Sequence, residues 1–330
     1  MTTESNPAEH DHVVETIQHL QGALRSSVMG RDDVIDLVLV GLLTDGHVLL
    51  EDYPGSGKTT LAKTLGLCLE SSSESHIDAF RRIQFTPDLL PSDVTGVMVF
   101  DPERGQFHLR KGPIFAHLVL VDEINRTSPK VQSALLEAMA EGQVTIDNTS
   151  HDLGEPFMVI ATQNPLDSVG TYPLPQAQLD RFLFKISMKN IEREFELQVM
   201  RTYGRHQPPA KPTPITTRAL VNVKHYIQEQ IHLSEAVENC LLDIADATRK
   251  HTETILGLST RSLVAAMSAL KAYSCLQGRA YVSPDDIVTL APHLFAHRLT
   301  VRGGAEQAIK ILNDCVHGPV ETLVSTSIKG

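Results

Sequence analysis

The sequence has no tryptophan and only four cysteines among its 330 residues. The cysteines are scattered at Cys68, Cys240, Cys275 and Cys315, so the close pairs of a zinc site or a redox motif are missing. No apolar stretch approaches the roughly 18 residues that a membrane-spanning helix needs. The N-terminal stretch MTTESNPAEHDHVV lacks the basic and then apolar layout of a signal peptide. We therefore expect a cytoplasmic protein without a membrane span.

The sequence also lacks an excess of positive charge. It has 29 Lys and Arg against 40 Asp and Glu, which gives a net charge of −11. Because general binding to nucleic acid normally needs a basic face, nucleic acid is not the expected partner, although local basic loops are compatible with this balance. The length predicts one large core and a smaller second one.

The stretch EDYPGSGKTT, residues 51–60, is the most informative feature that is present. It follows an apolar strand-like run and opens a helical pattern at 61–69, which is the context of a phosphate-binding loop. Gly55 and Gly57 permit turn conformations that other residues disfavour, so that backbone N–H groups can point at an anion from the helix N-terminus. Lys58 adds a positive charge for the outer phosphates, and the hydroxyl of Thr59 suits a phosphate-bound Mg²⁺.

One position departs from the full phosphate-loop pattern, which begins with Gly where this sequence has Asp52. That position lies furthest from the phosphates, so the pattern still predicts a nucleotide site. A chance Gly-rich turn before a helix is the alternative. The candidate nucleotide-binding residues of the loop are Pro54, Gly55, Ser56, Gly57, Lys58, Thr59 and Thr60.

Short apolar runs predict the strands of a mostly parallel sheet. They lie at 48–50, 82–86, 118–121, 157–162 and 182–187, and helical patterns lie at 11–28, 32–43, 129–141 and 192–203. Strands that alternate with helices are typical of a parallel sheet covered on both faces, so the predicted fold class is α/β.

Two interruptions of this alternation predict β-hairpins inserted into the core. Residues 97–109, VMVFDPERGQFHL, form two β-prone runs around a turn. Residues 143–159, QVTIDNTSHDLGEPFMV, have Asp-Asn and Leu-Gly breakers between apolar runs. Ordinary surface loops are the alternative for both.

The character of the chain changes after the last predicted strand. Residues 204–214, GRHQPPAKPTP, are rich in Pro and predict a semi-rigid linker between a nucleotide-binding core at 1–203 and a helical domain at 215–330. Helical patterns fill this second domain, at 216–230, 234–250, 259–276, 284–297 and 304–325. Ser283 predicts a helix start, because a Pro at the first helical position and two acids follow it.

Polar residues at two strand ends narrow the range of reactions that a phosphate-binding loop could serve. Asp122 and Glu123 follow the apolar run LVLV, and the carboxyl edge of an open α/β sheet is where ligands bind. There Asp122 is placed to hold the Mg²⁺ water shell, and Glu123 can polarise an attacking water as a general base. Asn164, in ATQNP at the end of the next strand, could orient the same water. Solvation of a strand end by the acids, and a plain turn role for Asn164, are the alternatives.

Together these residues resemble the AAA+ ATPases and, within them, the MoxR family. The resemblance runs from about residue 28 to 299 and is carried by the following strings: GHVLLEDYPGSGKT, RIQFTPDLLPSDVTG, FHLRKGPIF, VDEINRTSPKVQSALLEAMAEGQVTID, ATQNP, TYPLPQAQLDRF and GLSTRS. It implies a P-loop NTPase (AAA+) core with a parallel five-stranded sheet and β-hairpin inserts, followed by an all-helical lid domain. It also implies ATP and Mg²⁺ as ligands.

The resemblance implies a role for each residue of the site. Lys58 and Thr59 match the Walker A pair, Asp122 and Glu123 the Walker B pair, and Asn164 sensor 1, with Thr59 and Asp122 as the residues that hold the metal. Arg181 resembles an arginine finger that reaches the neighbouring subunit's site, a contribution of order 10³–10⁵ in rate. Arg261 resembles sensor 2, which reaches the γ-phosphate from the lid. A local ion pair for Arg181 and a solvated helix start for Arg261 are the alternatives.

Four further residues carry weaker implications. Gly30 and Arg31 are similar to the segment that lines the adenine pocket. Gln84 matches the place where related ATPases carry a polar residue that gates the catalytic Glu. Arg126 either faces a neighbouring subunit or forms a local salt bridge. The two hairpins resemble the helix-2 insert and the pre-sensor-1 insert of one AAA+ clade, in whose rings they project towards the pore or the substrate.

The family implies an ATP-hydrolysing ring, with a hexamer as the expected homo-oligomer. Such a ring acts as a chaperone-like factor that matures protein complexes, often beside a partner with a von Willebrand factor A-type domain. A nucleic-acid-handling motor, a nucleotide-gated scaffold with little hydrolysis and a small-molecule kinase are the competing hypotheses. The sequence does not identify the client protein.

Overall fold

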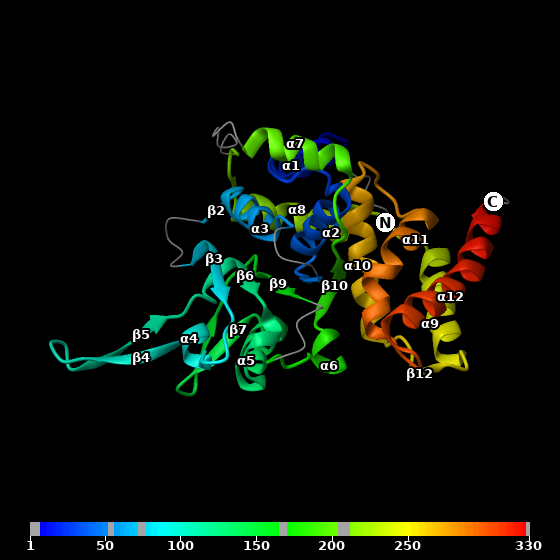
Figure 1. The fold of residues 1–330 in the computed structure, drawn as a ribbon. Helices are drawn as coiled ribbons and strands as arrows, with labels where there is room; N and C mark the ends of the chain where they lie inside the picture. Colours follow the sequence, from blue (N-terminus) through cyan, green and yellow to red (C-terminus); the bar gives the residue numbers. More distant parts are fainter. Residues whose placement is uncertain (1–6, 52–55, 72–76, 165–169, 204–211, 328–330) are drawn as a thin grey trace. The chain divides into compact units, whose positions relative to one another are not determined.

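The computed structural model describes residues 7–51, 56–71, 77–164, 170–203 and 212–327 (Figure 1). The chain forms two compact units. One comprises residues 20–174 and 186–221, and the other comprises residues 1–19, 175–185 and 222–330. Most of the expected linker at 204–214 lies outside the described residues, so the boundaries 1–203, 204–214 and 215–330 stay a prediction.

A five-stranded sheet forms the centre of the α/β fold, as predicted. Its order is β10 (Phe182–Ser187), β1 (His47–Glu51), β9 (Met158–Gln163), β6 (Ala116–Asp122) and β3 (Asp78–Gln84). The pairs β1–β9, β9–β6 and β6–β3 are parallel. All seven residues of β6 are buried, which agrees with a continuous apolar run that helices cover on both faces.

Helices of the first unit begin and end close to the predicted residues. They are α2 (Asp32–Leu43), α3 (Lys58–Leu67), α5 (Pro129–Glu141) and α7 (Arg193–Tyr203), whereas the short helix α4 (Pro91–Thr95) was not predicted. The helix α5 starts after Ser128 with Pro129 at its first position, and it ends before Gly142, which has a left-handed backbone with φ of 64°. Pro at the start and Gly after the end are the usual boundary residues of a helix, and they explain why the sequence located α5 so well.

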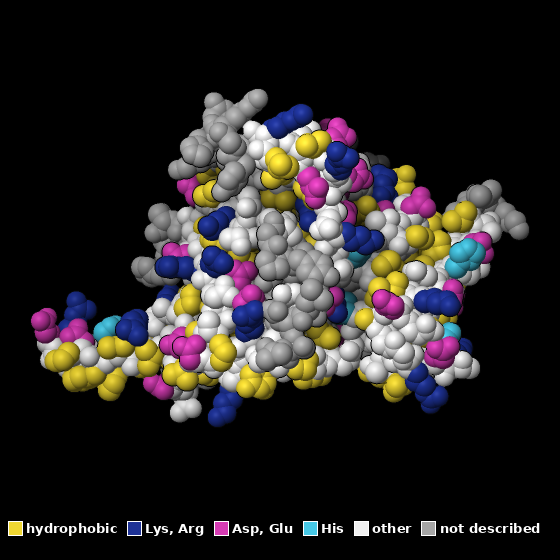
Figure 2. All heavy atoms as spheres, in the orientation of Figure 1, with side chains coloured by type: hydrophobic (Ala, Val, Ile, Leu, Met, Phe, Trp, Pro, Cys, Tyr) yellow, Lys and Arg dark blue, Asp and Glu magenta, His cyan; other side chains and the backbone are white. Residues whose placement is uncertain are grey.

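Both predicted insertions are β-hairpins. In the first, β4 (Gly96–Asp101) pairs antiparallel with β5 (Gln106–Lys111). Phe100 and Phe107 face each other on it with ring centroids 5.2 Å apart and are 50% and 65% exposed. Figure 1 shows this hairpin extending away from the central sheet, and Figure 2 shows hydrophobic side chains along it.

The second hairpin is shorter than the predicted segment 143–159. Strand β7 (Gln143–Ile146) pairs with β8 (Thr149–Asp152), and Asp147 and Asn148 make the turn with positive φ values of 47° and 65°. The apolar residues from Met158 onward belong to β9 in the central sheet. The period of alternation alone could not separate the end of a hairpin from the next buried strand.

The second unit is mainly helical. It contains α6 (Gln176–Leu179), α9 (Glu235–Lys250), α10 (Thr260–Leu276), α11 (Pro284–Phe295), the short 3₁₀ helix η2 (Ala296–Arg298) and α12 (Gly304–Ser327), together with α1 (Pro7–Ser27) and α8 (Thr217–Gln230), each of which continues into the first unit. The predicted start at Ser283 is confirmed, because α11 begins at Pro284 and the N–H of Ser283 donates to Asp286 Oδ2 (2.7 Å).

Short strands correct the expectation that everything after the linker is helical. In the second unit, β12 (Thr254–Leu256) pairs antiparallel with β13 (Thr300–Val301). In the first unit, β11 (Ile215–Thr216) pairs parallel with β2 (Leu69–Glu70). Segments of two or three residues are too short for a detectable alternation of polar and apolar residues. Within the described part of the chain, no helix combines the length and the apolar character needed to cross a membrane.

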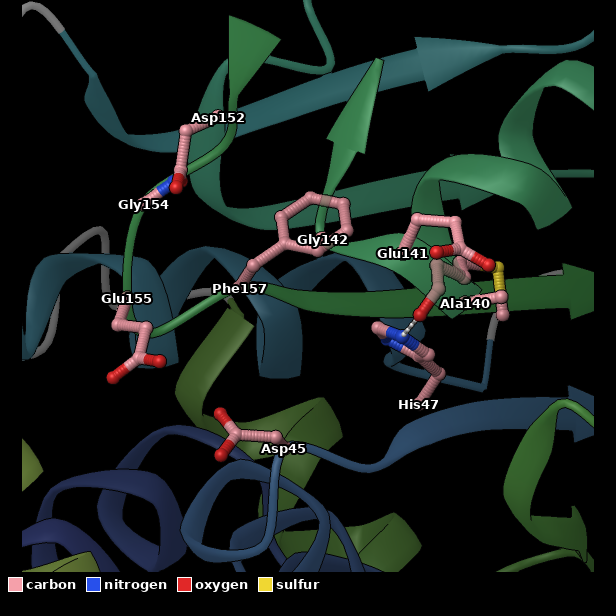
Figure 3. Close-up of a pocket in the computed structure, with 10 residues that line it drawn as sticks. Asp45, His47, Ala140, Glu141, Gly142, Asp152, Gly154, Glu155 and Phe157 are labelled. Carbon is pink, nitrogen blue, oxygen red and sulfur yellow. Dashed lines mark hydrogen bonds between the residues drawn. The ribbon is translucent and has the colours of Figure 1, made fainter. Parts of the chain in front are cut away.

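His47 joins three elements at the start of β1. Its Nδ1 accepts a hydrogen bond from the backbone N–H of Val159 (3.0 Å), so Nε2 carries the proton and donates to the carbonyl of Met139 (2.9 Å). The ring borders a cavity of about 390 Å³ (Figure 3). Burial lowers the pKa of His47 to about 4, so the ring is neutral at pH 7 and fixes β1 against β9 and the end of α5.

We predict that His47→Gln weakens the dependence of stability on pH. The pKa of His47 falls from 6.5 to about 4 on folding, so the unfolded chain binds a proton there first as the pH falls. The stability supplied by the neutral ring is present above about pH 6.5 and is lost as the pH falls toward 4, by about 3 kcal/mol. Urea unfolding across this pH range measures the change, with the exposed His225→Gln as the matched control. Equal pH slopes for wild type and His47→Gln would contradict the assignment.

Candidate functional site

The start of α3 has the geometry of an anion-binding turn. Gly57 precedes the helix with φ of 94°, and its carbonyl accepts the first helical hydrogen bond, from Leu61 N–H (2.9 Å). A Cβ at Gly57 would find its nearest neighbour, Val28 Cγ1, at 3.7 Å, so the backbone angle, not space, requires glycine here. The buried Oγ of Ser56 has no hydrogen-bond partner within the described structure. An orphaned hydroxyl beside a helix N-terminus fits a bound phosphate oxygen.

Other predicted loop residues surround this turn. Lys58 and Thr59 occupy the first two positions of α3 and are half-buried, and Thr60 is exposed. Pro54 and Gly55 lie outside the described residues. The structure therefore supplies the helix N-terminus, the cation and the hydroxyl that the sequence predicts, and leaves the first half of the loop untested.

Asp122 is held at the buried end of β6. Its Oδ2 accepts a hydrogen bond from Arg82 Nε (2.6 Å), and its Oδ1 accepts one from the hydroxyl of Thr162 (3.3 Å). That hydroxyl also accepts the backbone N–H of Glu123 (3.0 Å). Thr162 thus joins the two acids to the end of β9. The sequence analysis missed Arg82 and Thr162, although each lies within two residues of a predicted site residue.

Glu123 has an unusual backbone conformation. Its φ of 59° and ψ of 53° lie in the left-handed region, which is disfavoured for residues other than glycine and costs of order 1–3 kcal/mol. The left-handed backbone ends β6 in a sharp turn, after which the 3₁₀ helix η1 (Ile124–Arg126) begins. Such conformations persist where the surroundings over-determine them, and they are concentrated at functional sites.

Two neighbours hold the carboxylate of Glu123. Gln84 Nε2 donates to Glu123 Oε2 (2.9 Å), and Arg126 Nε lies 3.2 Å from the same oxygen. Gln84 is the register partner of Asp122 across β3 and β6. The local salt bridge considered for Arg126 is therefore present. The contact between Gln84 and Glu123 is the one that the predicted gating residue requires.

Asn164 follows β9 directly and is half-buried. In the parallel register of β6 and β9, Val121 lies opposite Ala161, so Glu123 and Asn164 leave neighbouring strands at the same edge. Glu51, at the end of β1, accepts a hydrogen bond from Gln163 there. The carboxyl ends of β1, β6 and β9 thus bring acidic and amide side chains together at the ligand-binding edge of the sheet.

Gly30 and Arg31 connect the start of α2 with the segment after β10. Gly30 has φ of 67°, and a Cβ there would lie 2.7 Å from the ring of Phe195. Arg31 is 6% exposed and its Nη1 donates to the carbonyl of Lys189, whereas its Nε has no hydrogen-bond partner in the described structure. Both residues therefore have packing roles in the first unit, and the adenine-lining role stays a prediction.

The predicted arginine residues Arg181 and Arg261 belong to the second unit. Arg181 lies between α6 and β10, and Arg261 is the exposed second residue of α10. The helix α10 is capped by the side chain of Ser259, which accepts the N–H of Ser262. Their roles towards a nucleotide stay predictions.

The donor set suits Mg²⁺ in a shared site with phosphate better than a dedicated metal cage. Among the described residues, no group of three or more His, Cys, Asp or Glu side chains is arranged to hold a metal ion. Mg²⁺ prefers oxygen ligands and commonly takes only one or two protein side chains beside phosphate and water. The Thr59 hydroxyl and the Asp122 carboxylate fit that requirement.

Comparisons with known proteins agree with this geometry. Residues 47–184 match the ATPase family associated with various cellular activities (AAA), and residues 246–314 match the AAA lid domain. The chain is 42% identical over 298 residues to the protein YeaC of Bacillus subtilis (strain 168), covering 90% of this chain and 89% of YeaC. It is 36% identical over 301 residues to Chaperone MoxR1 of Mycobacterium tuberculosis, covering 87% of this chain and 76% of MoxR1.

A solved structure extends the similarity to three dimensions. A crystal structure of a candidate ATPase from Cytophaga hutchinsonii superposes with a TM-score of 0.84 and 34% identity. The match covers 94% of this chain and 96% of that chain. The core and the helical region are both included in a match of that extent.

Proposed function

The chain belongs to the MoxR family of AAA+ ATPases, and on that premise we propose that it hydrolyses ATP to ADP and phosphate at the carboxyl edge of its sheet. Two features of the described structure support the proposal. A helix N-terminus with Gly57, Lys58 and Thr59 suits the phosphates, and the Asp122–Glu123 pair ends the neighbouring part of the sheet. Both are needed for phosphoryl transfer to water.

Each side chain of the site has a separate role in the proposed hydrolysis. Mg²⁺, held by Thr59 and Asp122, would supply positive charge to the phosphate oxygens. Lys58 neutralises the outer phosphates, and Glu123 polarises the water that attacks the γ-phosphorus as ADP leaves. Asn164 orients that water from the next strand end. Pre-positioning of this kind supplies most of the catalysis in phosphoryl transfer.

Two arginines of the second unit complete the proposed mechanism. Arg181 neutralises transition-state charge in the neighbouring copy's site, and Arg261 contacts the γ-phosphate from the lid. Each ATP then favours a tight boundary between copies, and its hydrolysis releases that boundary. The match to the AAA lid domain supports the lid assignment.

At the level of the cell, we propose a chaperone-like factor that remodels protein complexes as a homo-oligomer, with a hexamer as the expected ring. The relative named Chaperone MoxR1 supports the chaperone hypothesis. A protein with a von Willebrand factor A-type domain is the expected partner. Capture of clients by Glu123→Gln with ATP, compared with the same variant without nucleotide, tests it. Equal capture in both conditions would argue against nucleotide-driven remodelling.

A nucleic-acid motor is the second candidate, favoured by one surface. The β4–β5 hairpin combines the exposed rings of Phe100 and Phe107 with Arg104, Arg110 and Lys111, and aromatic stacking beside positive charge is a common way to bind single strands. The net charge of −11 opposes it. Binding of single-stranded DNA that weakens with salt and stimulates the ATPase would favour the motor over the chaperone.

We predict that Glu123→Gln and Lys58→Ala separate binding from chemistry. Glu123→Gln should retain ATP and lower kcat by about 10²–10⁴, the usual contribution of a general base. Lys58→Ala should lose ATP affinity. Phosphate release and binding of a fluorescent ATP analogue measure the two effects, with the exposed Glu238→Gln as the control. Undiminished hydrolysis in Glu123→Gln would remove the general-base role.

We also predict that Gln84→Ala raises the basal rate of ATP hydrolysis severalfold at an unchanged KM. The amide of Gln84 holds the Glu123 carboxylate, and hydrogen bonds to a charged group contribute about 1.5–3 kcal/mol, so its removal frees Glu123 to reach the water. Steady-state phosphate release measures the effect, and the exposed Gln228→Ala serves as the control. A lowered kcat would show instead that Gln84 positions Glu123 for catalysis.

A further inference from the structure

We propose that His297 and Arg298, from η2, are positioning residues that fix the backbone around Arg181 so that this arginine can act on the neighbouring copy. The proposal rests on the proposed function, because it needs Arg181 to work between copies. It concerns contacts within the second unit only, where Asp180, Phe182 and η2 all lie. Below, the contacts of η2 with the segment Asp180–Phe182 are called the η2 clamp.

The first half of the clamp is a buried ion pair. The side chain of Arg298 is 5% exposed, and its Nε lies 3.2 Å from Asp180 Oδ1. Burial lowers the pKa of Arg298 to about 10, an effect that Asp180 opposes, so the guanidinium remains charged at neutral pH. Replacing a buried ion pair by apolar residues is often neutral or stabilising, so its presence is weak evidence for a role in stability. A role in fixing geometry accounts for it better.

The second half of the clamp acts on a single backbone carbonyl. The oxygen of Phe182 accepts hydrogen bonds from His297 Nε2 (3.0 Å) and Arg298 Nη2 (3.1 Å). Burial, and then the charge of Arg298, lower the pKa of His297 to about 3, which keeps the ring neutral with its proton on Nε2. In the other direction, Gln176 on α6 donates to the carbonyl of His297. The 3₁₀ helix η2 therefore donates hydrogen bonds to Phe182 and accepts one from α6.

Arg181 lies between the two anchored positions. Asp180 before it is held through its carboxylate, Phe182 after it is held through its carbonyl, and the N–H of Arg181 itself donates to Gln178 O (3.2 Å). Three consecutive residues are thus fixed while Arg181 is only half-buried. Transition-state stabilisation depends on such fixing, because a misplacement of about 1 Å can cost about 100-fold in rate.

Arg298 also lies close enough to Arg261 for the charge of Arg261 to add to the effect of burial, which lowers the pKa of Arg298 against the opposing effect of Asp180. The η2 clamp therefore adjoins both arginines that the proposed mechanism takes from this unit. Arg298 makes no contact with nucleotide in this proposal and acts only through the segment that carries Arg181. A role through Arg261 would affect the copy's own site instead, and the experiment below separates the two.

The test uses Arg298→Met, which replaces the buried cation by an apolar side chain of similar length. We expect kcat for ATP to fall about 10- to 100-fold with little change in KM, because the finger acts mainly on the transition state. Arg302→Met, at an exposed arginine four residues on, is the matched control and should hydrolyse ATP normally. Should Arg298→Met fail to fold, as judged by circular dichroism, Asp180→Asn removes the other half of the pair.

Mixed assemblies decide where the defect lies. Co-expressed with differently tagged Glu123→Gln copies, which keep the clamp and Arg181, Arg298→Met copies regain an intact finger from a neighbour. With equal amounts of the two variants, activity should then rise to about a quarter of the wild-type rate, the share of productive boundaries in a randomly mixed ring. Arg181→Ala mixed with Glu123→Gln is the reference. Rescue of Arg181→Ala but not of the clamp variant would overturn the inference, as would full activity of Arg298→Met alone. Failure of the reference mixture would overturn the trans finger itself.

A pair of substitutions tests the histidine independently. His297→Gln keeps a side-chain N–H that can donate to the carbonyl of Phe182, whereas His297→Leu removes the donor at similar volume. We expect the Leu variant to lose several times more kcat than the Gln variant, and the same mixing with Glu123→Gln to restore it. Equal activity of the two variants would show that the hydrogen bond does not position Arg181.

Discussion

Two carboxylates at the end of a fully buried strand are the constraint on which the site depends. All seven residues of β6 are buried, so Asp122 and Glu123 meet water only at the edge of the sheet. A carboxylate at such a boundary needs hydrogen bonds or charge pairing to replace part of its lost hydration. Arg82 and Thr162 meet that need for Asp122, and Gln84 and Arg126 meet it for Glu123. The left-handed backbone of Glu123 is the turn that lets the two acids take different partners.

The same partners bear on the proposed hydrolysis of ATP. The side chains that hold Asp122 and Glu123 would have to give up part of their hydrogen bonding if Mg²⁺ and water bound there. Arg82 competes with a metal for Asp122, and Gln84 competes with water for Glu123. Under the proposed function, these polar contacts would be exchanged, not created, on nucleotide binding.

The sequence predicted the helices and strands whose positions depend on neighbouring residues in the chain. Apolar runs located the five strands, Pro129 and Gly142 bounded α5, and the capping residues at Ser283 located α11. Contacts formed by distant segments could not be predicted, since Arg298 and Phe182 are 116 residues apart and meet only in the folded chain. The strands β12 and β13 were missed because they are too short to show alternation. The catalytic roles of Asn164, Arg181 and Arg261 stay predictions.

The β4–β5 hairpin carries two exposed phenylalanine rings, and the contact area that one such hairpin offers to another molecule is small. Assembly of several subunits into a ring would increase the total contact. Several identical hairpins held at fixed spacing raise the local concentration of contacts for any long, flexible chain that reaches two of them, and combined avidity can exceed a single affinity by about 10²–10⁴. A single subunit would release such a chain quickly, whereas a closed ring would retain it.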